Sequence, residues 1–189
     1  MSARKFHLLP ILLLALAPAV TRADKYEDAV NVFRHAGESA SFFGHSYGYA
    51  IFPTIGKGGI GIGGAHGSGR VFVHGGHVGD ASMTQVTVGF QFGGQAYSEI
   101  IFLEDERTFK EFSSGEFALG AQATAVAITA SVNAQATTTG SGASAGLTEK
   151  DTKTAGMYQK GMAVFTAAKG GLMYEATVGG QKFGYKKKK

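Results

Sequence analysis

Lysines beside paired glycines are the residues of this chain best suited to binding chemistry. They occur twice, as Lys57-Gly58-Gly59 and as Lys169-Gly170-Gly171. Glycine turns expose backbone N–H groups, which can form concave anion-binding nests, and a neighbouring ammonium adds positive charge. Because similar segments precede the two corners, we interpret them as two related β-hairpin corners that bind an anion. The alternative is that glycine serves turn geometry and lysine serves solubility.

Two motifs of enzymes occur in the wrong context. Residues 44–48 match the G-x-S-x-G elbow of serine hydrolases. That elbow needs a strand before it and a helix after it, whereas here we expect a helix before and a strand after. Residues 56–61 fit G-x-G-x-x-G, but the pattern that follows predicts no helix whose N-terminus could hold a pyrophosphate. We therefore expect no catalytic residues, no enzymatic activity and no cofactor.

Histidines and carboxylates are the remaining candidates for chemistry. His66, His74 and His77 have uneven spacing for a metal site, and the chain has no cysteine. We interpret them as exposed histidines of strands and turns, and expect no metal. An acidic set surrounds a short expected helix, and we interpret it as capping and surface charge rather than an acid–base pair. Its members are Glu99, Glu104, Asp105, Glu106 and Glu111.

The first 23 residues have the three parts of an export signal. Arg4 and Lys5 form a basic start, residues 8–16 form an apolar run, and Ala23 ends a small-residue cleavage site. The apolar run is too short to span a hydrocarbon core of about 30 Å. We expect a signal peptide over residues 1–23 and one domain over residues 24–189, exported to the periplasm or cell envelope; the alternative is a buried N-terminal helix.

The basic character of the chain comes from its two ends. The formal net charge is +4, but removal of the expected leader leaves 15 basic against 14 acidic residues. Four of those 15 are Lys186, Lys187, Lys188 and Lys189. A nucleic-acid-binding domain would spread lysine and arginine over a face, so we expect no nucleic-acid partner. The tail is either a local anchor for anionic surfaces or a solvated run without a partner.

The spacing of apolar residues predicts an α+β fold, mainly antiparallel β with Gly-rich hairpins. An amphipathic helix is expected from residue 24 to about residue 43, packed on a sheet or, alternatively, inserted in a membrane. A short internal helix begins after Asp105 and stops at Gly115. With 29 glycines the chain is rich in turns, and a two-residue hairpin turn is expected at Gly75-Gly76.

Strands are expected on both sides of the internal helix. Residues 84–92 alternate, with Thr84 and Val86 facing one way and Gln85 and Thr87 the other, which is typical of a half-buried strand. Tightly packed strands are expected at residues 100–103, 121–136, 162–167 and 172–179, and an exposed loop at residues 137–154.

A set of short motifs resembles the SYLF domain, also called the Ysc84 actin-binding domain. The motifs occur in the expected order over nearly all of residues 24–189: GYAIFP (48–53), GKGG (56–59), ASMTQ (81–85), GFQ (89–91), GGQ (93–95), SEII (98–101), FSSG (112–115), GA (120–121), AVF (163–165) and KGGL (169–172). The resemblance implies recognition of anionic phospholipid at a membrane surface, without chemistry. A signal peptide followed directly by this domain is similar to bacterial exported members described as lipid-binding. Some eukaryotic members bind actin, a partner that we do not expect in a bacterial envelope.

The resemblance assigns the lipid phosphate to both lysine corners, which match the family's motif: Lys57, Gly58, Gly59, Lys169, Gly170 and Gly171. Phe42 on the N-terminal helix and the tail lysines, Lys186 to Lys189, would add membrane contacts. This mode of attachment requires the two lysine corners to lie on one side of the domain. The competing expectation is a scaffold protein of the cell envelope, whose aromatic and glycine-rich strands bind another protein.

Overall fold

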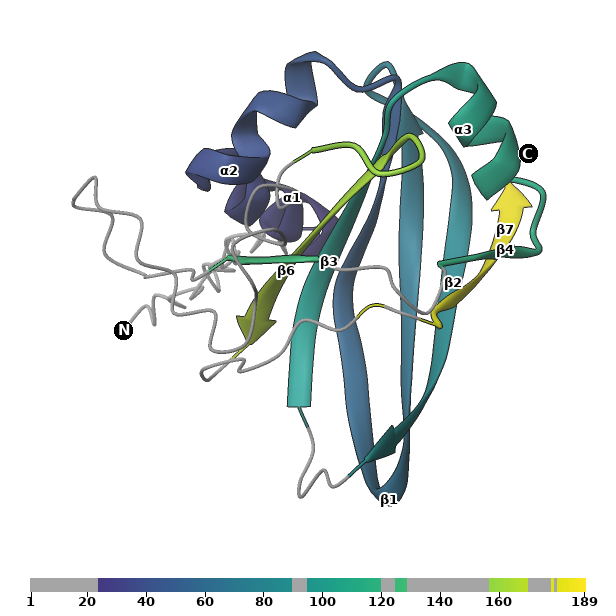
Figure 1. Cartoon of the computed structure of the whole chain (residues 1–189). Helices are drawn as coiled ribbons and strands as arrows, with labels where there is room; N and C mark the ends of the chain where they lie inside the picture. Colours follow the sequence, from purple (N-terminus) through teal and green to yellow (C-terminus); the bar gives the residue numbers. More distant parts are fainter. Residues whose placement is uncertain (1–23, 90–94, 120–124, 129–156, 170–177, 179) are drawn as a thin grey trace, which may run out of the picture.

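One curled, mainly antiparallel sheet forms the body of the protein (Figure 1). The computed structural model describes residues 24–89, 95–119, 125–128, 157–169, 178 and 180–189. The strand order is β4-β7-β2-β1-β3-β6-β5, and β5 runs parallel to β6. The strands are β1 (Gly48–Val73), β2 (Gly76–Gly89), β3 (Gln95–Leu103), β4 (Phe117–Ala118), β5 (Val126–Ile128), β6 (Met162–Lys169) and β7 (Lys182–Lys187). The expected α+β class is confirmed.

The N-terminal helical region is divided into three short helices. They are α1 (Lys25–His35), α2 (Gly37–Ala40) and the 3-10 helix η1 (Ser41–Gly44). The single helix expected to about residue 43 is interrupted because Ala36 adopts an extended backbone, with φ −86° and ψ 125°. The internal helix α3 (Glu106–Phe112) follows the prediction: the carboxylate of Asp105 accepts from the backbone N–H of Thr108 at 2.7 Å and caps its start.

Helix α1 lies against the outer face of the sheet. Its buried side chains are Ala29, Val30 and Phe33, and they join a cluster that includes Ile100 of β3 and Phe165 of β6. The apolar stripe of α1 is therefore packed on the sheet, as expected, and does not face a membrane. Among the described residues, no helix has the length and apolar character needed to cross a membrane.

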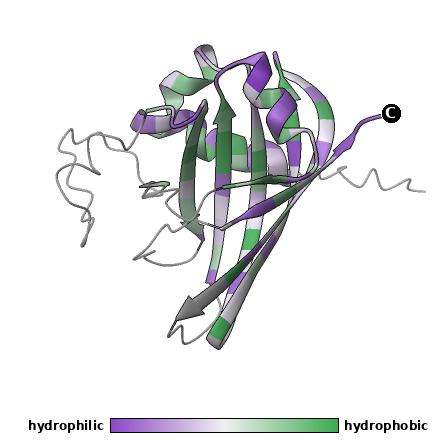
Figure 2. Ribbon diagram, turned by 45° about the vertical axis from the view of Figure 1, so that its right-hand side comes forward, coloured by the Kyte–Doolittle hydropathy of each residue, from purple (hydrophilic) through white to green (hydrophobic). Residues whose placement is uncertain are grey.

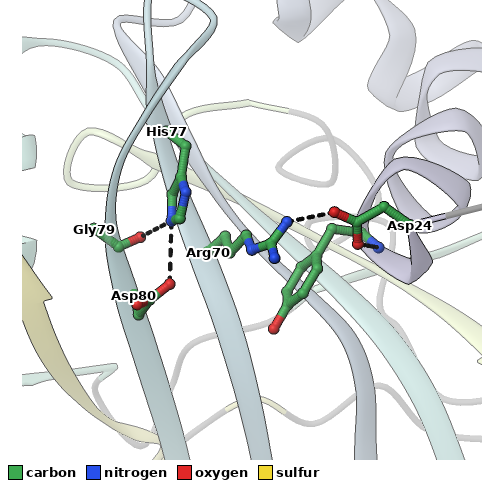
Figure 3. A network of polar contacts seen from close by, with 6 residues as sticks. Asp24, Arg70, His77, Gly79 and Asp80 are labelled. Atoms are coloured by element: carbon green, nitrogen blue, oxygen red, sulfur yellow. Dashed lines mark hydrogen bonds and ion pairs between the residues drawn. The ribbon is translucent and has the colours of Figure 1, made fainter. Parts of the chain in front are cut away.

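Arg70 ties the start of α1 to β1 (Figure 3). Its guanidinium pairs with the Asp24 carboxylate at 2.5 Å and lies 4.0 Å from the centre of the Tyr26 ring. The hydrogen bond from the Tyr26 backbone N–H and then the Arg70 guanidinium lower the pKa of Asp24. Because both charged groups are partly exposed, this contact orients the helix more than it stabilises the fold.

Strand β1 folds back on itself and contributes two neighbouring arms to the sheet (Figure 1). The first arm, residues 48–57, pairs with β3, and the second arm, residues 61–73, pairs with β2. The arms touch where the backbone of Gly69 meets the ring of Phe52. The reversal includes Gly59, whose φ of 153° and closeness to the returning arm leave no room for a side chain.

The two faces of the sheet carry separate apolar clusters. Phe183 of β7 and Val164 of β6 come from distant strands but belong to one cluster, so the curl encloses this inner face. Along β3, Tyr97 and Ile101 point inward to that cluster, whereas Ile100 points outward to the cluster under α1. Residues 100–103 are fully buried, as the sequence predicts.

Two local predictions about β2 are wrong. The turn that precedes β2 is formed by His74 and Gly75, with φ of 49° and 80°, one residue earlier than expected. Both residues have positive φ, the geometry of a hairpin turn that matches strand twist. The faces of β2 are also reversed, since Val86 is 76% exposed and Gln85 is 4% exposed.

The strands after the internal helix are described in part. Strand β6 confirms the prediction for residues 162–167, and β5 lies within the strand expected at residues 121–136. The expected loop at residues 137–154 and strand residues 172–177 lie outside the described residues.

Candidate functional site

Lys57 and Lys169 lie on opposite faces of the sheet. Lys57 pairs with Gln95 and points to the inner face, where it is 9% exposed. Lys169 pairs with Ala96 and points to the outer face, where its ammonium donates to the Thr54 hydroxyl at 2.9 Å. Consecutive residues of a strand point to opposite faces, so the expectation that both lysine corners share one side of the domain is wrong.

A one-residue offset between the two similar segments explains this separation. Residues 50–52 and 163–165 flank β3 on its two sides. Ile51 and Phe165 both align with Ile100, so Phe52 and Phe165, which correspond in sequence, face in opposite directions. A shift of one residue moves a whole strand pattern to the other face. The two segments are therefore similar in sequence, but their corresponding side chains point to opposite faces of the sheet.

Gly59 of the first corner serves the reversal of β1. A Cβ added at Gly58 would have no atom within 4 Å, whereas Gly59 packs against the returning arm. This backbone role agrees with the turn-geometry alternative for the first corner. Gly170 and Gly171 lie outside the described residues.

Phe42 is a core residue and not a surface one. It is 9% exposed and stacks on Phe102, with ring centres 5.3 Å apart. It also meets the Phe165 ring edge-on at 5.1 Å. The expected membrane contact through Phe42 is wrong for this conformation, because α1 ends early and η1 turns this ring toward the sheet.

The lysine-rich C-terminus forms a strand of the sheet. Lys186 and Lys187 belong to β7 and pair with Asp80 and Gly79 of β2. The backbone N–H of Lys188 continues the pairing by donating to Val78 at 2.9 Å. Figure 2 shows the hydrophilic character of this C-terminal segment. The side chains of residues 186–189 are exposed, so the sheet holds the backbone and leaves the ammonium groups in solvent.

An outer surface that no helix of the described residues covers extends over β7, β2 and the second arm of β1. The register aligns Lys182 with Thr84 and His66, so these side chains share the outer face. We call this surface the open face; its exposed members are Ile62, Gly64, His66, Ser68, Asp80, Ser82, Thr84, Val86, Lys182 and Lys186.

The open face is apolar at one end and cationic along β7. Ile62 and Val86 are 71% and 76% exposed, and they lie toward the reversal of β1. Lys182 and Lys186 supply positive charge from β7, and the carboxylate of Asp80 is 3.1 Å from the imidazole of His77. Sequence reasoning missed this surface because the alternation of β2 predicted that Val86 would be buried.

A buried polar cluster on the inner face was also missed. Glu99 is fully buried, and its Oε2 accepts from the side-chain amide of Gln181 at 2.9 Å. The same amide lies 3.4 Å from the hydroxyl of Tyr97. In the described part of the chain, Oε1 of Glu99, Oε1 of Gln181 and Oγ1 of Thr166 have no hydrogen-bond partner. The interpretation of Glu99 as surface charge is therefore wrong.

Burial dominates the electrostatics of this cluster. It raises the pKa of Glu99 to about 8, against the opposing effect of the Gln181 hydrogen bond. Burial and then the Glu99 charge raise the pKa of Tyr97. At neutral pH the Glu99 carboxyl is therefore mainly protonated and uncharged. The signal in the sequence is the position of Glu99, two residues from both Tyr97 and Ile101 on one strand face.

The three histidines are held by separate contacts. The imidazole of His77 lies 3.0 Å from the carbonyl oxygen of Gly79 (Figure 3). His74 packs edge-on against the Tyr47 ring, and His66 is on the open face. In the described ranges, no group of three metal-ligating side chains gathers at one point.

Comparison with known proteins connects this fold to a family. A family model described as "Ysc84: Las17-binding protein actin regulator" matches residues 84–188, which is more than half of the chain. Proteins of this family bind actin or lipids, and the family is one of binding domains rather than of known enzymes. No curated protein matches the chain.

Proposed function

Because the chain belongs to the Ysc84 family, we propose that it binds anionic phospholipid at a membrane surface through the open face. The observation that carries this proposal is the combination on one face of exposed aliphatic side chains, Ile62 and Val86, with the exposed lysines 182 and 186. Aliphatic side chains gain free energy by leaving water for the acyl boundary, and ammonium groups gain it near anionic headgroups.

The proposal replaces the attachment expected from the two lysine corners. Lys169 also lies on the outer face, but on β6, across the curled sheet from β7. Lys57 points into the inner face. The lysines of β7 and of the C-terminus, residues 182 and 186–189, are the denser group of exposed cations. The proposed setting is the cell envelope of an exported protein.

Vesicle co-sedimentation tests the proposal. The protein should pellet with vesicles of phosphatidylglycerol and phosphatidylcholine, and pelleting should weaken as salt rises, because exposed charges are screened over about 8 Å at physiological ionic strength. Equal pelleting with pure phosphatidylcholine would contradict the electrostatic contribution. No pelleting with either vesicle would favour the scaffold alternative, in which the aromatic and glycine-rich strands bind another envelope protein.

The aliphatic contribution can be measured separately. An Ile62→Ser/Val86→Ser double variant should bind anionic vesicles at least several-fold more weakly, because less apolar surface leaves water on binding. Since both side chains are already exposed, the variant should unfold at nearly the same temperature as the wild-type protein. A Ser68→Ala/Ser82→Ala variant changes exposed residues of the same face and serves as the control. If the Ile62→Ser/Val86→Ser variant bound vesicles with unchanged affinity, insertion of the apolar end of the open face into the membrane would be excluded.

A further inference from the structure

A groove that shares no residue with the open face lies at the end of the sheet where η1 and α3 are found. Its volume is about 400 Å³, and it is lined by Ser41, Phe42, His45, Glu104, Met157 and Tyr158. The lining comes from three places: η1 and the residue after it, the connection between β3 and α3, and the segment before β6. Nothing in the family description or in the proposed lipid contact involves this groove.

The apolar lining of the groove consists of two aromatic rings, Phe42 and Tyr158, and the thioether side chain of Met157. The rings of Phe42 and Tyr158 meet edge-on, with centres 5.2 Å apart, and they are held by the core beneath them. Met157 also lines the groove and is 63% exposed. Aromatic faces attract cations, and a flexible thioether adapts to an aliphatic chain. This lining suits a long side chain that ends in a positive charge.

The polar lining presents acceptors and neutral hydroxyls. Glu104 is exposed and, within the described ranges, forms no ion pair. Burial and then the charge of Glu104 raise the pKa of Tyr158. Nδ1 of His45 lies 2.8 Å from the carbonyl oxygen of Ser41. Since a carbonyl only accepts, Nδ1 carries the proton, and Nε2 of the neutral ring is left as an acceptor.

We propose that this groove binds the side chain of an arginine or lysine on a partner polypeptide. The aliphatic stem lies along Met157 and the exposed part of the Tyr158 ring, which Phe42 supports from the core, and the cationic end meets the Glu104 carboxylate. A zwitterionic lipid headgroup fits less well, because its phosphate would need a cation. Among the described residues that line the groove there is no lysine or arginine, and the one carboxylate, Glu104, forms no ion pair in the described part of the chain, whereas the next two acidic residues, Asp105 and Glu106, pair with Arg107 and Lys110 of α3.

The methyl resonance of Met157 reports on this site. In the full chain labelled at methionine methyl groups, N-acetyl-arginine amide and N-acetyl-lysine amide should shift the Met157 signal in a saturable way. N-acetyl-citrulline amide has nearly the same shape as the arginine probe but no charge, and it should bind at least several-fold more weakly. O-phosphoethanolamine, the soluble lipid headgroup, should also bind more weakly than the arginine probe.

Matched variants complete the test. The Glu104→Gln variant should bind the arginine probe at least several-fold more weakly than the wild-type protein. The Glu116→Gln variant, which changes an exposed carboxylate outside the groove lining, should bind it with unchanged affinity. Equal binding of the citrulline probe, or an equal loss in the two variants, would overturn the proposal. Tighter binding of O-phosphoethanolamine would overturn it in favour of a lipid headgroup. These probes need no vesicle, so the result is independent of the proposed membrane contact.

Discussion

A Glu99→Gln variant should have a higher free energy of unfolding than the wild-type protein at pH 8, and the gap should shrink at pH 5. Glu99 is fully buried beside Gln181, and burial raises its pKa to about 8. Glutamine keeps the shape and carries no charge at any pH. Its side-chain carbonyl can still accept from the Gln181 amide, as Oε2 of Glu99 does.

The direction of the pH effect follows from the two states of Glu99. Its folded pKa of about 8 lies above its ordinary value of 4.5, so the unfolded chain loses this proton first as pH rises. The contribution of Glu99 to stability is complete below pH 4.5, falls as pH rises from 4.5 to about 8, and is constant above that range. The total loss is a few kcal/mol, since one pKa unit corresponds to about 1.4 kcal/mol.

Urea unfolding at several pH values measures this effect. The difference between Glu99→Gln and the wild-type protein isolates Glu99 from the histidines that titrate in the same range. Glu116→Gln removes an exposed carboxylate and should give the wild-type pH dependence. A Glu99→Gln curve that runs parallel to the wild-type curve from pH 5 to pH 8 would show that Glu99 titrates normally.

A Gly69→Ala variant should be strongly destabilised, because it places a methyl group between the two arms of β1. The added Cβ would lie 2.7 Å from the ring of Phe52 and 2.8 Å from the carbonyl oxygen of Ile51. Neither neighbour can move freely, since Phe52 is fully buried and Ile51 belongs to the paired arm. Overpacking of this kind costs about 1–3 kcal/mol or more.

Gly56→Ala is the matched control for Gly69→Ala. Gly56 belongs to the same strand, but an added Cβ would have no atom within 4 Å. We expect its melting temperature to equal or slightly exceed that of the wild-type protein, because alanine restricts the unfolded chain. If the Gly69→Ala and Gly56→Ala variants had the same melting temperature, the two arms of β1 could not pack as closely as described.

Much of the fold follows from local sequence signals. The cap at Asp105 and the apolar run at residues 100–103 predict α3 and the centre of β3, since capping and burial are encoded locally. The fold-back of β1 was not predicted, because its many glycines read as separate short pieces. The outward direction of Val86 could not be read from β2 alone, because both faces of this strand carry apolar residues and Met83 occupies the inner one.

The candidate site was harder to predict than the fold. The two Lys-Gly-Gly motifs and the family resemblance indicated lysine as the binding residue, but the face on which each lysine lies depends on strand register. Lys57 and Lys169 differ by one position in that register and point to opposite faces. Lys186 was not distinguished from a solvated tail and Lys182 was not singled out, because only the pairing of this segment with β2 makes it one side of the open face.

Charge reversal on β7 tests the central claim most directly. A Lys182→Glu/Lys186→Glu variant should be compared with Lys25→Glu/Lys160→Glu, which makes the same change in net charge at exposed lysines outside the open face. Co-sedimentation with phosphatidylglycerol vesicles at low salt should fall at least tenfold for the first variant and much less for the second, because each cation at the surface contributes about 1 kcal/mol. Equal binding by the two variants would contradict attachment through the open face.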